Sequence, residues 1–584
     1  MARTRACGTD TVVTSVAVLG GGVAGLSAAH ELAERGFDVT VYEARPDAFG
    51  GKARSIPVPD SGTGGRIDLP GEHGFRFFPG FYKHIPDTMA RTPHGHKTVV
   101  DHLVPTTRIL LAQADGRPEI IGLAERPSSF DDFTAAAEFI RKTATGLGLS
   151  GQELAVFIER LLTLLSSCDE RRFGQWEKTS WWEYTDAANR SPAFQKFLAD
   201  GMTRTLVAAQ AQEMSARTGG LILCQLVFDM VRTEGRVSRV LDGPTSEVWI
   251  DPWTDHLGNL GVELRIDSKV TAIKCDGTRI TGVTVEGEAG VQPVVADYYL
   301  SAMPKEQLEK LLSPELLSAD PALARLLHLH TSWMNGIMFY LDKDVQLQPG
   351  HTIFIDSEWS LTAISQKQFW PDVNLTKRGD GRVEGILSID ISEWQRAGRK
   401  IKKVAAACTK EEITAEVWAQ VVAHIDDGSL DERNVVASFL DPAIVFADPT
   451  PNTAPTPTGN LEPLLINTVD SWSNRPEART RIPNFFLASD YVRTYTDLAT
   501  MEGANEAARR AVNGILDATG SAASRCRIWP LQEPRAFETA RRADRVLWAL
   551  RQPPRPPVSV NAKGELEPAN PLTKGIVGLL RFVG

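Results

Sequence analysis

The most constraining feature of the sequence is a glycine-rich turn near the N-terminus. An apolar run, Thr11 to Leu19, is followed by Gly20, Gly22 and Gly25 and then by an Ala-rich run. The G-x-G-x-x-G spacing between a strand and a helix is typical of a dinucleotide site. The first glycine permits the tight turn, the second lets backbone amides approach a pyrophosphate, and the third lets the helix pack against the strand. The pattern therefore predicts a Rossmann-like unit whose helix N-terminus faces the phosphates.

The residues after this turn fit the same unit. A helix is expected to end at Gly36, and a second strand is expected over 37–42. Glu43 then stands at the end of that strand, where an acidic residue accepts hydrogen bonds from a ribose. Glu43, Ala44 and Arg45 are therefore predicted to bind the cofactor.

A second glycine pair, Gly50 and Gly51, follows the acid and is itself followed by Arg54. Backbone amides and a guanidinium group in this position can bind the same pyrophosphate. NAD enzymes rarely need a second anion cradle, whereas a larger dinucleotide such as FAD could use one. All three residues are predicted to bind the cofactor.

Composition excludes several other classes. The chain has 584 residues, 42% hydrophobic and 23% charged, which leaves room for two or three domains. Its net charge of −10 argues against general nucleic-acid binding. The six cysteines lack C-x-x-C spacing, which predicts neither a disulfide framework nor a zinc site, and no metal site is expected. No apolar run of about 18 residues predicts a transmembrane helix, so the expected location is cytoplasmic.

The order of these motifs resembles the flavin amine oxidase and phytoene desaturase superfamily. The matching elements are G-x-G-x-x-G, Glu43-Ala44-Arg45 and Gly50-Gly51-Lys52-Ala53-Arg54-Ser55. Two further segments, GEHGFRFFPGFY from Gly71 and MEGANEAARRAV from Met501, are most similar to its phytoene desaturase and hydroxysqualene dehydroxylase branch. They are also similar to bacterial flavoproteins of polycyclic tetramate macrolactam pathways. The resemblance implies FAD, held noncovalently because no Cys or His stands where a covalent link is expected.

The resemblance also implies that the flavin end of the site is built near the C-terminus. A strand would lead to Asp490, which would bind the ribityl–phosphate part of FAD, although Ser489 replaces the usual glycine before it. A helix starting at Met501 would lie under the flavin pyrimidine edge, where its N-terminus stabilises negative charge on the reduced ring. Glu502 and Ala504 would lie beside it. The backbone of Val270 would contact adenine.

These assignments predict an α/β fold in which a Rossmann-like FAD-binding domain is interleaved with an α+β substrate domain. The substrate domain is expected to combine a mixed sheet with a helical cap, and residues 85–242 are expected to be mostly helical. The predicted boundaries are 12–84, 243–305 and 462–520 for the FAD-binding domain, 85–242 and 306–461 for the substrate domain, and 521–584 for a C-terminal extension. Its basic and apolar part, 525–584, is expected either to contact a membrane or to pack on its own domain or a dimer partner.

Five polar residues are candidates for catalysis because they stand in or beside the flavin segments. They are Glu72, His73, Arg76, Tyr491 and Glu502. The sequence assigns none of them as acid or base.

Three functions fit the sequence. The first is an FAD oxidoreductase that transfers a hydride between flavin N5 and a lipophilic polyene or isoprenoid, either in desaturation or in cyclisation of a polyene such as a polycyclic tetramate macrolactam precursor. Its redox partner would be a quinone, oxygen or transiently bound NAD(P)H. The second is a flavin amine oxidase, which is disfavoured because Glu309 stands five residues after Pro304, where many amine oxidases have lysine. The third is a non-catalytic lipid-binding relative.

Overall fold

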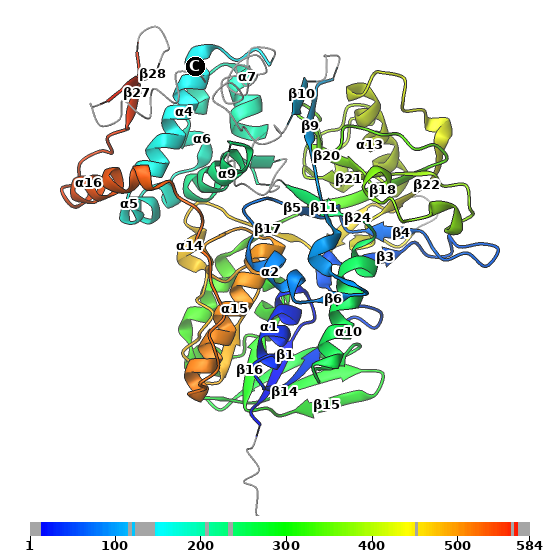
Figure 1. Ribbon diagram of the computed structural model, residues 1–584, viewed down its shortest axis with the longest axis vertical. Coiled ribbons are helices and arrows are strands. Elements are labelled where there is room, and N and C mark those ends of the chain that lie inside the picture. Colours follow the sequence, from blue (N-terminus) through cyan, green and yellow to red (C-terminus); the bar gives the residue numbers. More distant parts are fainter. Residues whose placement is uncertain are drawn as a thin grey trace, which may run out of the picture.

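The computed structural model in Figure 1 has three parts: a parallel sheet with flanking helices, a bundle of short helices, and a larger mixed sheet. Residues 130–141 of the predicted helical region and the apolar residues 575–583 of the C-terminal extension lie outside the residues that it describes. The described residues are 13–114, 119–122, 147–201, 203–204, 209–231, 238–449, 454–561 and 566–569.

The parallel sheet is assembled from distant parts of the chain. Its central strands are short and buried on both faces, as expected for a parallel sheet covered by helices. This confirms the predicted α/β class with a Rossmann-like sheet, and we call this part the nucleotide domain. The strand order is β12 (Glu263–Arg265), β2 (Asp38–Tyr42), β1 (Ser15–Leu19), β16 (Tyr298–Ser301) and β26 (Phe485–Leu487).

Helices and a small antiparallel sheet complete the core of the nucleotide domain. The helices are α1 (Val23–Ala33), α15 (Met501–Thr519) and α10 (Asp251–Asn259), and the small sheet comprises β13 (Lys269–Cys275), β14 (Ile280–Gly287) and β15 (Gly290–Val294). The chain turns at Asp267 (φ 47°), so β12 and β13 belong to different sheets.

The larger sheet has seven strands and two chemically different faces. Ile389 and Ile391 pack against helix α13 (Lys410–His424) in one apolar core. Because strand side chains alternate, Asp390 points to the opposite face. The strand order is β10 (Glu119–Gly122), β9 (Arg108–Ala112), β19 (Thr352–Phe354), β20 (Leu361–Ser365), β21 (Gly385–Ile391), β18 (Asn335–Leu341) and β22 (Val435–Leu440), with β9 and β19 parallel and the other pairs antiparallel.

The short helices form a cap beside this sheet. Phe157, Trp181 and Leu223 share its core, and Ser150 caps the first helix together with Glu153. The helical prediction is wrong for the first part of 85–242, which supplies β8 (Leu103–Pro105), β9 and β10, because short apolar runs fit either a strand or a helix. The cap helices are α4 (Gly151–Ser166), α5 (Asp169–Gly174), α6 (Trp181–Tyr184) and α9 (Ala216–Val231).

The described part of the C-terminal extension packs on both the nucleotide domain and the cap. The Trp529 N–H donates a hydrogen bond to His84 Nε2 at 3.0 Å. Asp544, on helix α16 (Glu538–Ala549), forms a buried ion pair with Arg171 at 3.0 Å. The extension therefore joins the nucleotide domain to the cap.

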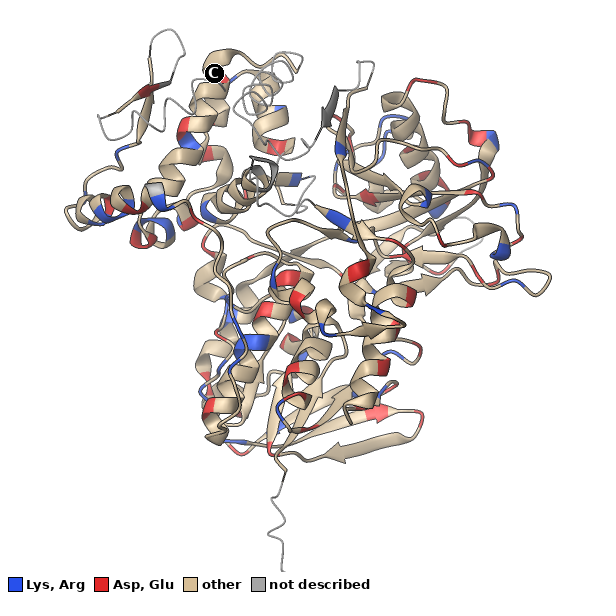
Figure 2. Cartoon of the chain, in the orientation of Figure 1, with Lys and Arg blue, Asp and Glu red and all other residues tan. Residues whose placement is uncertain are grey.

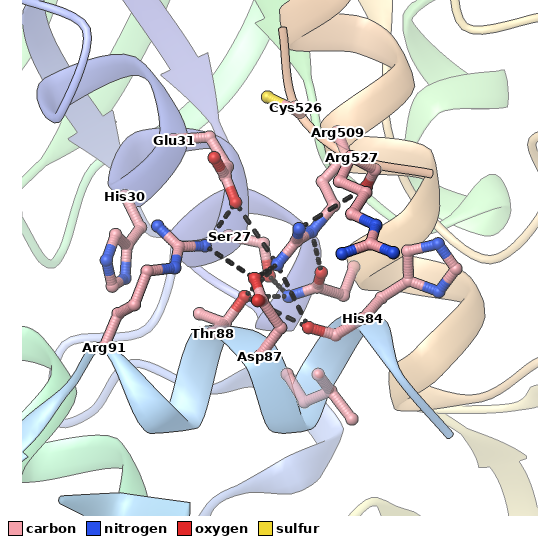
Figure 3. A network of polar contacts seen from close by, with 12 residues as sticks. Ser27, His30, Glu31, His84, Asp87, Thr88, Arg91, Arg509, Cys526 and Arg527 are labelled. Carbon is pink, nitrogen blue, oxygen red and sulfur yellow. Dashed lines mark hydrogen bonds and ion pairs between the residues drawn. The ribbon is translucent and has the colours of Figure 1, made fainter. Parts of the chain in front are cut away.

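A buried ionic network ties together three helices of the nucleotide domain, as Figure 3 shows. Arg509 on α15 is 2% exposed and donates to Asp87 on α2 (His84–Ala90) at 2.6 Å. It also lies 3.3 Å from Glu31 on α1, which pairs with Arg91 at 2.5 Å. The network fixes α1 and α15 relative to each other, and both helices begin at the site described next.

Candidate active site

The first glycine turn leaves a cradle of free backbone between β1 and α1. Gly20 has φ +108°, and a Cβ there would lie 3.1 Å from the backbone of Ala302. A Cβ at Gly25 would lie 1.9 Å from the Gly20 carbonyl oxygen, so the helix can approach the strand only at glycine. Gly22 caps α1 without a side-chain hydrogen bond. The first amides of α1 are therefore available to an anion.

The second glycine pair lies directly against the first turn. Gly50 and Gly51 have φ of +100° and +56°, and the Gly50 N–H donates to the Gly21 carbonyl at 2.9 Å. Arg54 is buried and donates to Gly51 O at 2.6 Å and to Glu462 Oε1 at 3.0 Å. It does not line the cavity. The prediction that Arg54 contacts the pyrophosphate is therefore corrected: its guanidinium supports the second turn from behind.

The side chain of Glu43 is fixed by backbone amides of the first glycine turn and of its own loop. Its carboxylate accepts the Gly21 N–H at 2.8 Å and the Arg45 N–H at 2.9 Å. Glu43, Ala44 and Arg45 all line the cavity, and Val270 lies in the same wall. Burial raises the pKa of Glu43, and the backbone amides of Arg45 and Gly21 oppose that shift in part.

Substituting Glu43→Gln is expected to weaken FAD binding about tenfold, because one acceptor oxygen of a charge-assisted hydrogen-bond set is replaced by a donor. Since the pKa of Glu43 is raised, FAD affinity of the wild type should fall as pH decreases through that pKa, and the glutamine variant should lack this dependence. Titration of the apoprotein with FAD, followed by flavin fluorescence, measures both effects. Wild-type affinity in the variant would remove Glu43 from the binding set.

The loop after β26 and the start of α15 form another part of the cavity wall. Ser489 has φ +152°, a value that favours glycine, and Asp490 after it lines the cavity. The Thr500 side chain accepts the Gly503 N–H at 3.1 Å and so caps α15. Met501 and Ala504 line the cavity on the first turn of that helix.

The loop after β4 (Pro70–Glu72) brings polar groups to the cavity. His73 and Arg76 both line the cavity. His73 Nδ1 lies 2.6 Å from Asp441 Oδ2, and Arg76 donates to the Lys52 carbonyl at 2.8 Å. Gly74 lies between His73 and Arg76 in the sequence. Because it has no side chain, the loop can approach the large sheet closely.

Three predicted catalytic candidates lie outside the cavity lining and are corrected here. Glu72 is 2% exposed and accepts hydrogen bonds from Ser55 Oγ at 2.8 Å and Thr245 N at 3.0 Å. Glu502 accepts the first backbone amides of α2 at 2.7–3.0 Å. Tyr491 is fully buried in the core of the nucleotide domain. Each supports the structure from behind the wall.

Other cavity-lining polar residues were not singled out from the sequence. Asp390 and Thr362 come from the large sheet, Glu306 follows β16, and His351 precedes β19. Burial lowers the pKa of His351 to about 3. The only sequence signal for Asp390 was a single acid inside an apolar strand, Ile389-Asp390-Ile391.

An ionic cluster lies behind His73. The ligand atoms of His73, Asp441 and Glu462 lie within 4.8 Å of one another, close enough to hold a cation. Arg45 and Arg54 both form ion pairs with Glu462. Because these guanidinium groups already balance the carboxylates, the cluster is a hydrogen-bonded ion network rather than a built metal site.

One cavity of about 1330 Å³ connects all these groups. That exceeds the volume of a usual small-molecule pocket, so it has room for a dinucleotide and a second ligand. Its far end is apolar and is lined by the cap and the large sheet. The apolar lining residues are Ile109, Leu111, Leu147, Leu149, Leu154, Phe157, Phe197, Leu198, Leu223, Leu226, Ile353 and Ile355.

The cradle fits FAD on structural grounds. Two adjoining glycine turns leave no room for a Cβ at Gly20 or Gly25 and present uncapped helix amides to a pyrophosphate. Glu43 and the first turn of α15 line the same cavity. Gly25 itself does not line the cavity, because its part is to let α1 pack against the turn.

Comparison with known proteins agrees with this geometry. Residues 23–516 match the family described as flavin containing amine oxidoreductase. A probable zeta-carotene desaturase of Synechococcus elongatus is 25% identical over 541 residues, 87% of this chain and 100% of that protein. The 15-cis-phytoene desaturase of Arabidopsis thaliana is 24% identical, over 84% of this chain and 77% of that protein.

Solved structures share the fold. A putrescine oxidase matches with a TM-score of 0.57 at 12% identity, over 87% of this chain and 99% of that structure. A cyclohexylamine oxidase from Brevibacterium oxydans matches with a TM-score of 0.55 at 13% identity, over 87% of this chain and 100% of that structure. The extent of the family match, together with the two glycine turns, shows that the chain belongs to the flavin-containing amine oxidoreductase family and is an FAD enzyme of its phytoene desaturase-like branch.

Proposed function

We propose that this enzyme oxidises or cyclises a long, lipophilic polyene or isoprenoid. The observation that carries the proposal is the apolar far end of the cavity, which continues from the flavin end between the cap and the large sheet. Aliphatic and aromatic side chains there exclude water and offer a hydrocarbon chain a continuous apolar surface. Polar groups are concentrated at the flavin end, around His73 and Arg76.

The similar proteins support the same class of substrate. They include desaturases of zeta-carotene and of 15-cis-phytoene, and a carotenoid phi-ring synthase of Chlorobaculum tepidum. The relatives' names thus include desaturases and a carotenoid ring synthase, the last of which matches over 49% of this chain and 42% of its own length. The proposal therefore specifies a polyene substrate and includes both desaturation and cyclisation as possible reactions. A quinone or NAD(P)H would be the redox partner.

An amine oxidase is the less favoured alternative. Lys310 does line the cavity, one residue after Glu309. Its turn, Glu309–Leu311, packs against β13, at the Val270 end of the site and away from the flavin loop. The aromatic residues of that loop, Phe75 and Phe77, contact His351 in tilted and edge-on arrangements. These contacts do not resemble a cage for an amine.

When bound, FAD supplies the acceptor or donor of two electrons and a hydrogen. The chain supplies the surroundings of that exchange. The α15 N-terminus presents its partial positive charge to the flavin end, and the apolar wall keeps water from the reacting carbons. His73 and Arg76 place positive or hydrogen-bonding groups beside the same space.

The extension supplies a surface for the membrane contact included in this proposal. Val546 and Leu550, on and next to α16, are 59% and 64% exposed. Arg542 and Arg545 lie on the same helix and pair with Glu538 and Glu170, and Figure 2 shows basic positions along α16. Exposed apolar groups among arginines favour an anionic lipid surface. No helix in the described part of the chain has the length and apolarity needed to cross a bilayer.

The proposal is tested by incubating the holoenzyme anaerobically with 15-cis-phytoene and zeta-carotene in phosphatidylcholine vesicles. Bleaching of the flavin absorbance and a new polyene product by mass spectrometry are expected. Flavin that stays oxidised with both polyenes but is bleached by an aliphatic amine would replace the proposal with the amine oxidase.

Narrowing the apolar end of the cavity should lower activity more for long polyenes than for short ones. Leu226 on α9 lines the cavity, so Leu226→Trp is expected to lower kcat/KM for zeta-carotene by at least about tenfold, a cost of about 1.4 kcal/mol, with the FAD content unchanged. Shorter polyenes should lose less. The matched control is Leu221→Trp on the same helix but outside the lining. Equal losses in both variants would contradict an apolar tunnel along α9.

A further inference from the structure

One acidic side chain of the large sheet faces the cavity at the flavin end. Asp390 lies on β21 between two isoleucines that pack against α13, so strand alternation turns its carboxyl toward the cavity. It is 7% exposed. A Cβ at Gly74 would lie 2.4 Å from Asp390 Oδ1, which places the carboxyl directly against the loop that carries His73 and Arg76.

The Asp390 carboxyl has no committed partner. Among the described residues, no hydrogen bond and no ion pair within 4.0 Å reaches either of its oxygens, and only charges at longer range act on it. Of the nearby charged groups, His73 Nδ1 lies 2.6 Å from Asp441, and Arg76 donates through Nη2 to the Lys52 carbonyl at 2.8 Å, while its Nε is buried without a hydrogen-bond partner. A nearly buried carboxyl that has no protein partner and faces a cavity is available to a bound ligand, which a purely structural role for Asp390 does not explain.

The surroundings of Asp390 suit a group that exchanges a proton near neutral pH. Burial raises the pKa of Asp390 to about 7, Arg76 and His73 oppose this shift by their charge, and Asp441 adds to it. Carboxyls with such values in a cavity are suited to general acid–base work. By contrast, the pKa of Asp441 is lowered: burial acts upward, but His73 and Asn335 outweigh it.

We propose that Asp390 is the proton acceptor for substrate oxidation in this cavity. The inference rests on the proposed function and names the residue that completes it. FAD, when bound, would accept the hydrogen and both electrons of one substrate C–H bond. The C–H bond of the neighbouring carbon breaks, its two electrons form the new C=C bond, and its proton binds an oxygen of Asp390. The neutral acid returns that proton to water once the product has left.

The test compares the holoenzyme with Asp390→Asn and Asp390→Glu, using 15-cis-phytoene and zeta-carotene vesicles as probes. Under anaerobic stopped flow, the wild-type rate of flavin bleaching should rise as pH increases through about 7, because the carboxylate is the active form. Asp390→Asn should be slower by at least about 100-fold without that rise, and Asp390→Glu should be intermediate. FAD content should stay at the wild-type level. Asp342→Asn, an exposed carboxyl at the end of β18, is the matched control.

A second readout does not depend on the substrate. Infrared difference spectra of the holoenzyme should contain a protonated-carboxyl band that disappears as pH rises through about 7 and is absent from Asp390→Asn. Wild-type bleaching rates in Asp390→Asn, or a band that persists in it, would overturn the assignment. If neither polyene bleaches the wild-type flavin, the polyene proposal fails instead. The infrared band alone then supports or overturns an exchangeable proton at Asp390.

Discussion

Gly25→Ala is expected to yield a protein that retains less than about a tenth of the wild-type FAD. The new Cβ would lie 1.9 Å from the Gly20 carbonyl oxygen and 3.0 Å from its carbonyl carbon. Both are backbone atoms of a turn that is itself held at φ +108°. Since neither side can yield cheaply, α1 must move away from β1 and carry its N-terminal amides out of register with the pyrophosphate. The ratio of flavin absorbance to protein absorbance after purification measures the loss.

A matched glycine in the same domain separates this effect from a general cost of substitution. Gly258 lies within α10, and a Cβ there meets no atom within 4 Å. Gly258→Ala should therefore retain FAD fully and should be neutral or more stable by about 0.5–1 kcal/mol, because alanine favours the helix. Wild-type FAD content in Gly25→Ala would contradict a helix locked against the turn by this glycine.

The parts of the fold and site that could be predicted from the sequence are those marked by short motifs of neighbouring residues. Gly20, Gly22 and Gly25 stand between an apolar strand and a helix, and each constrains the backbone around itself. The family resemblance then added the distant Asp490 and Met501 to the same site, and both line the cavity. Segments far apart in the sequence could be assigned to one site because each of them carries its own local motif.

The direction of individual side chains could not be predicted from their position in the sequence. Glu72 and His73 are neighbours, but Glu72 ends β4 and is buried behind the wall, whereas His73 begins the following loop and lines the cavity. On α15, Met501 and Ala504 share one face at three-residue spacing, whereas Glu502 is rotated toward α2. Each prediction placed a residue in the right segment, and the choice of face required the fold.

Asp390 was missed for a different reason. The face of β21 that it occupies becomes a cavity wall only because α13 covers the other face. Helix α13 and the loop of His73 are both remote from β21 in sequence, and no local spacing links them. A lone acid in an apolar strand is a usable signal once the covered face is known.

Arg509→Ala is expected to lower the free energy of unfolding of the nucleotide domain by about 2–3 kcal/mol, because it removes a buried guanidinium group and leaves the buried polar groups that it contacts short of one hydrogen-bond donor. Arg509 contacts Asp87 on α2 and Asn505 on its own helix, and it lies 3.3 Å from Glu31 on α1 (Figure 3). Its guanidinium also lies 5.3 Å from the Trp529 ring of the extension. Flavin release on heating, followed by fluorescence, should occur at a markedly lower temperature. Arg542→Ala, at a side chain 73% exposed, should change it little.

The same variant should become more sensitive to acid. Burial alone would raise the pKa of Glu31, but the charges of Arg509, Arg91 and Arg35 outweigh it and the pKa is lowered from 4.5. A lowered pKa in the folded state contributes stability that is present above pH 4.5 and is lost as pH falls through the folded value. Without Arg509, the pKa of Glu31 rises and this contribution shrinks, so flavin release should begin at a higher pH than in the wild type. The helices α1 and α15 each begin at the FAD site, so the network should also position the cofactor. If Arg509→Ala unfolds at a lower temperature but binds FAD as tightly as the wild type, the network stabilises the helices without positioning the cofactor.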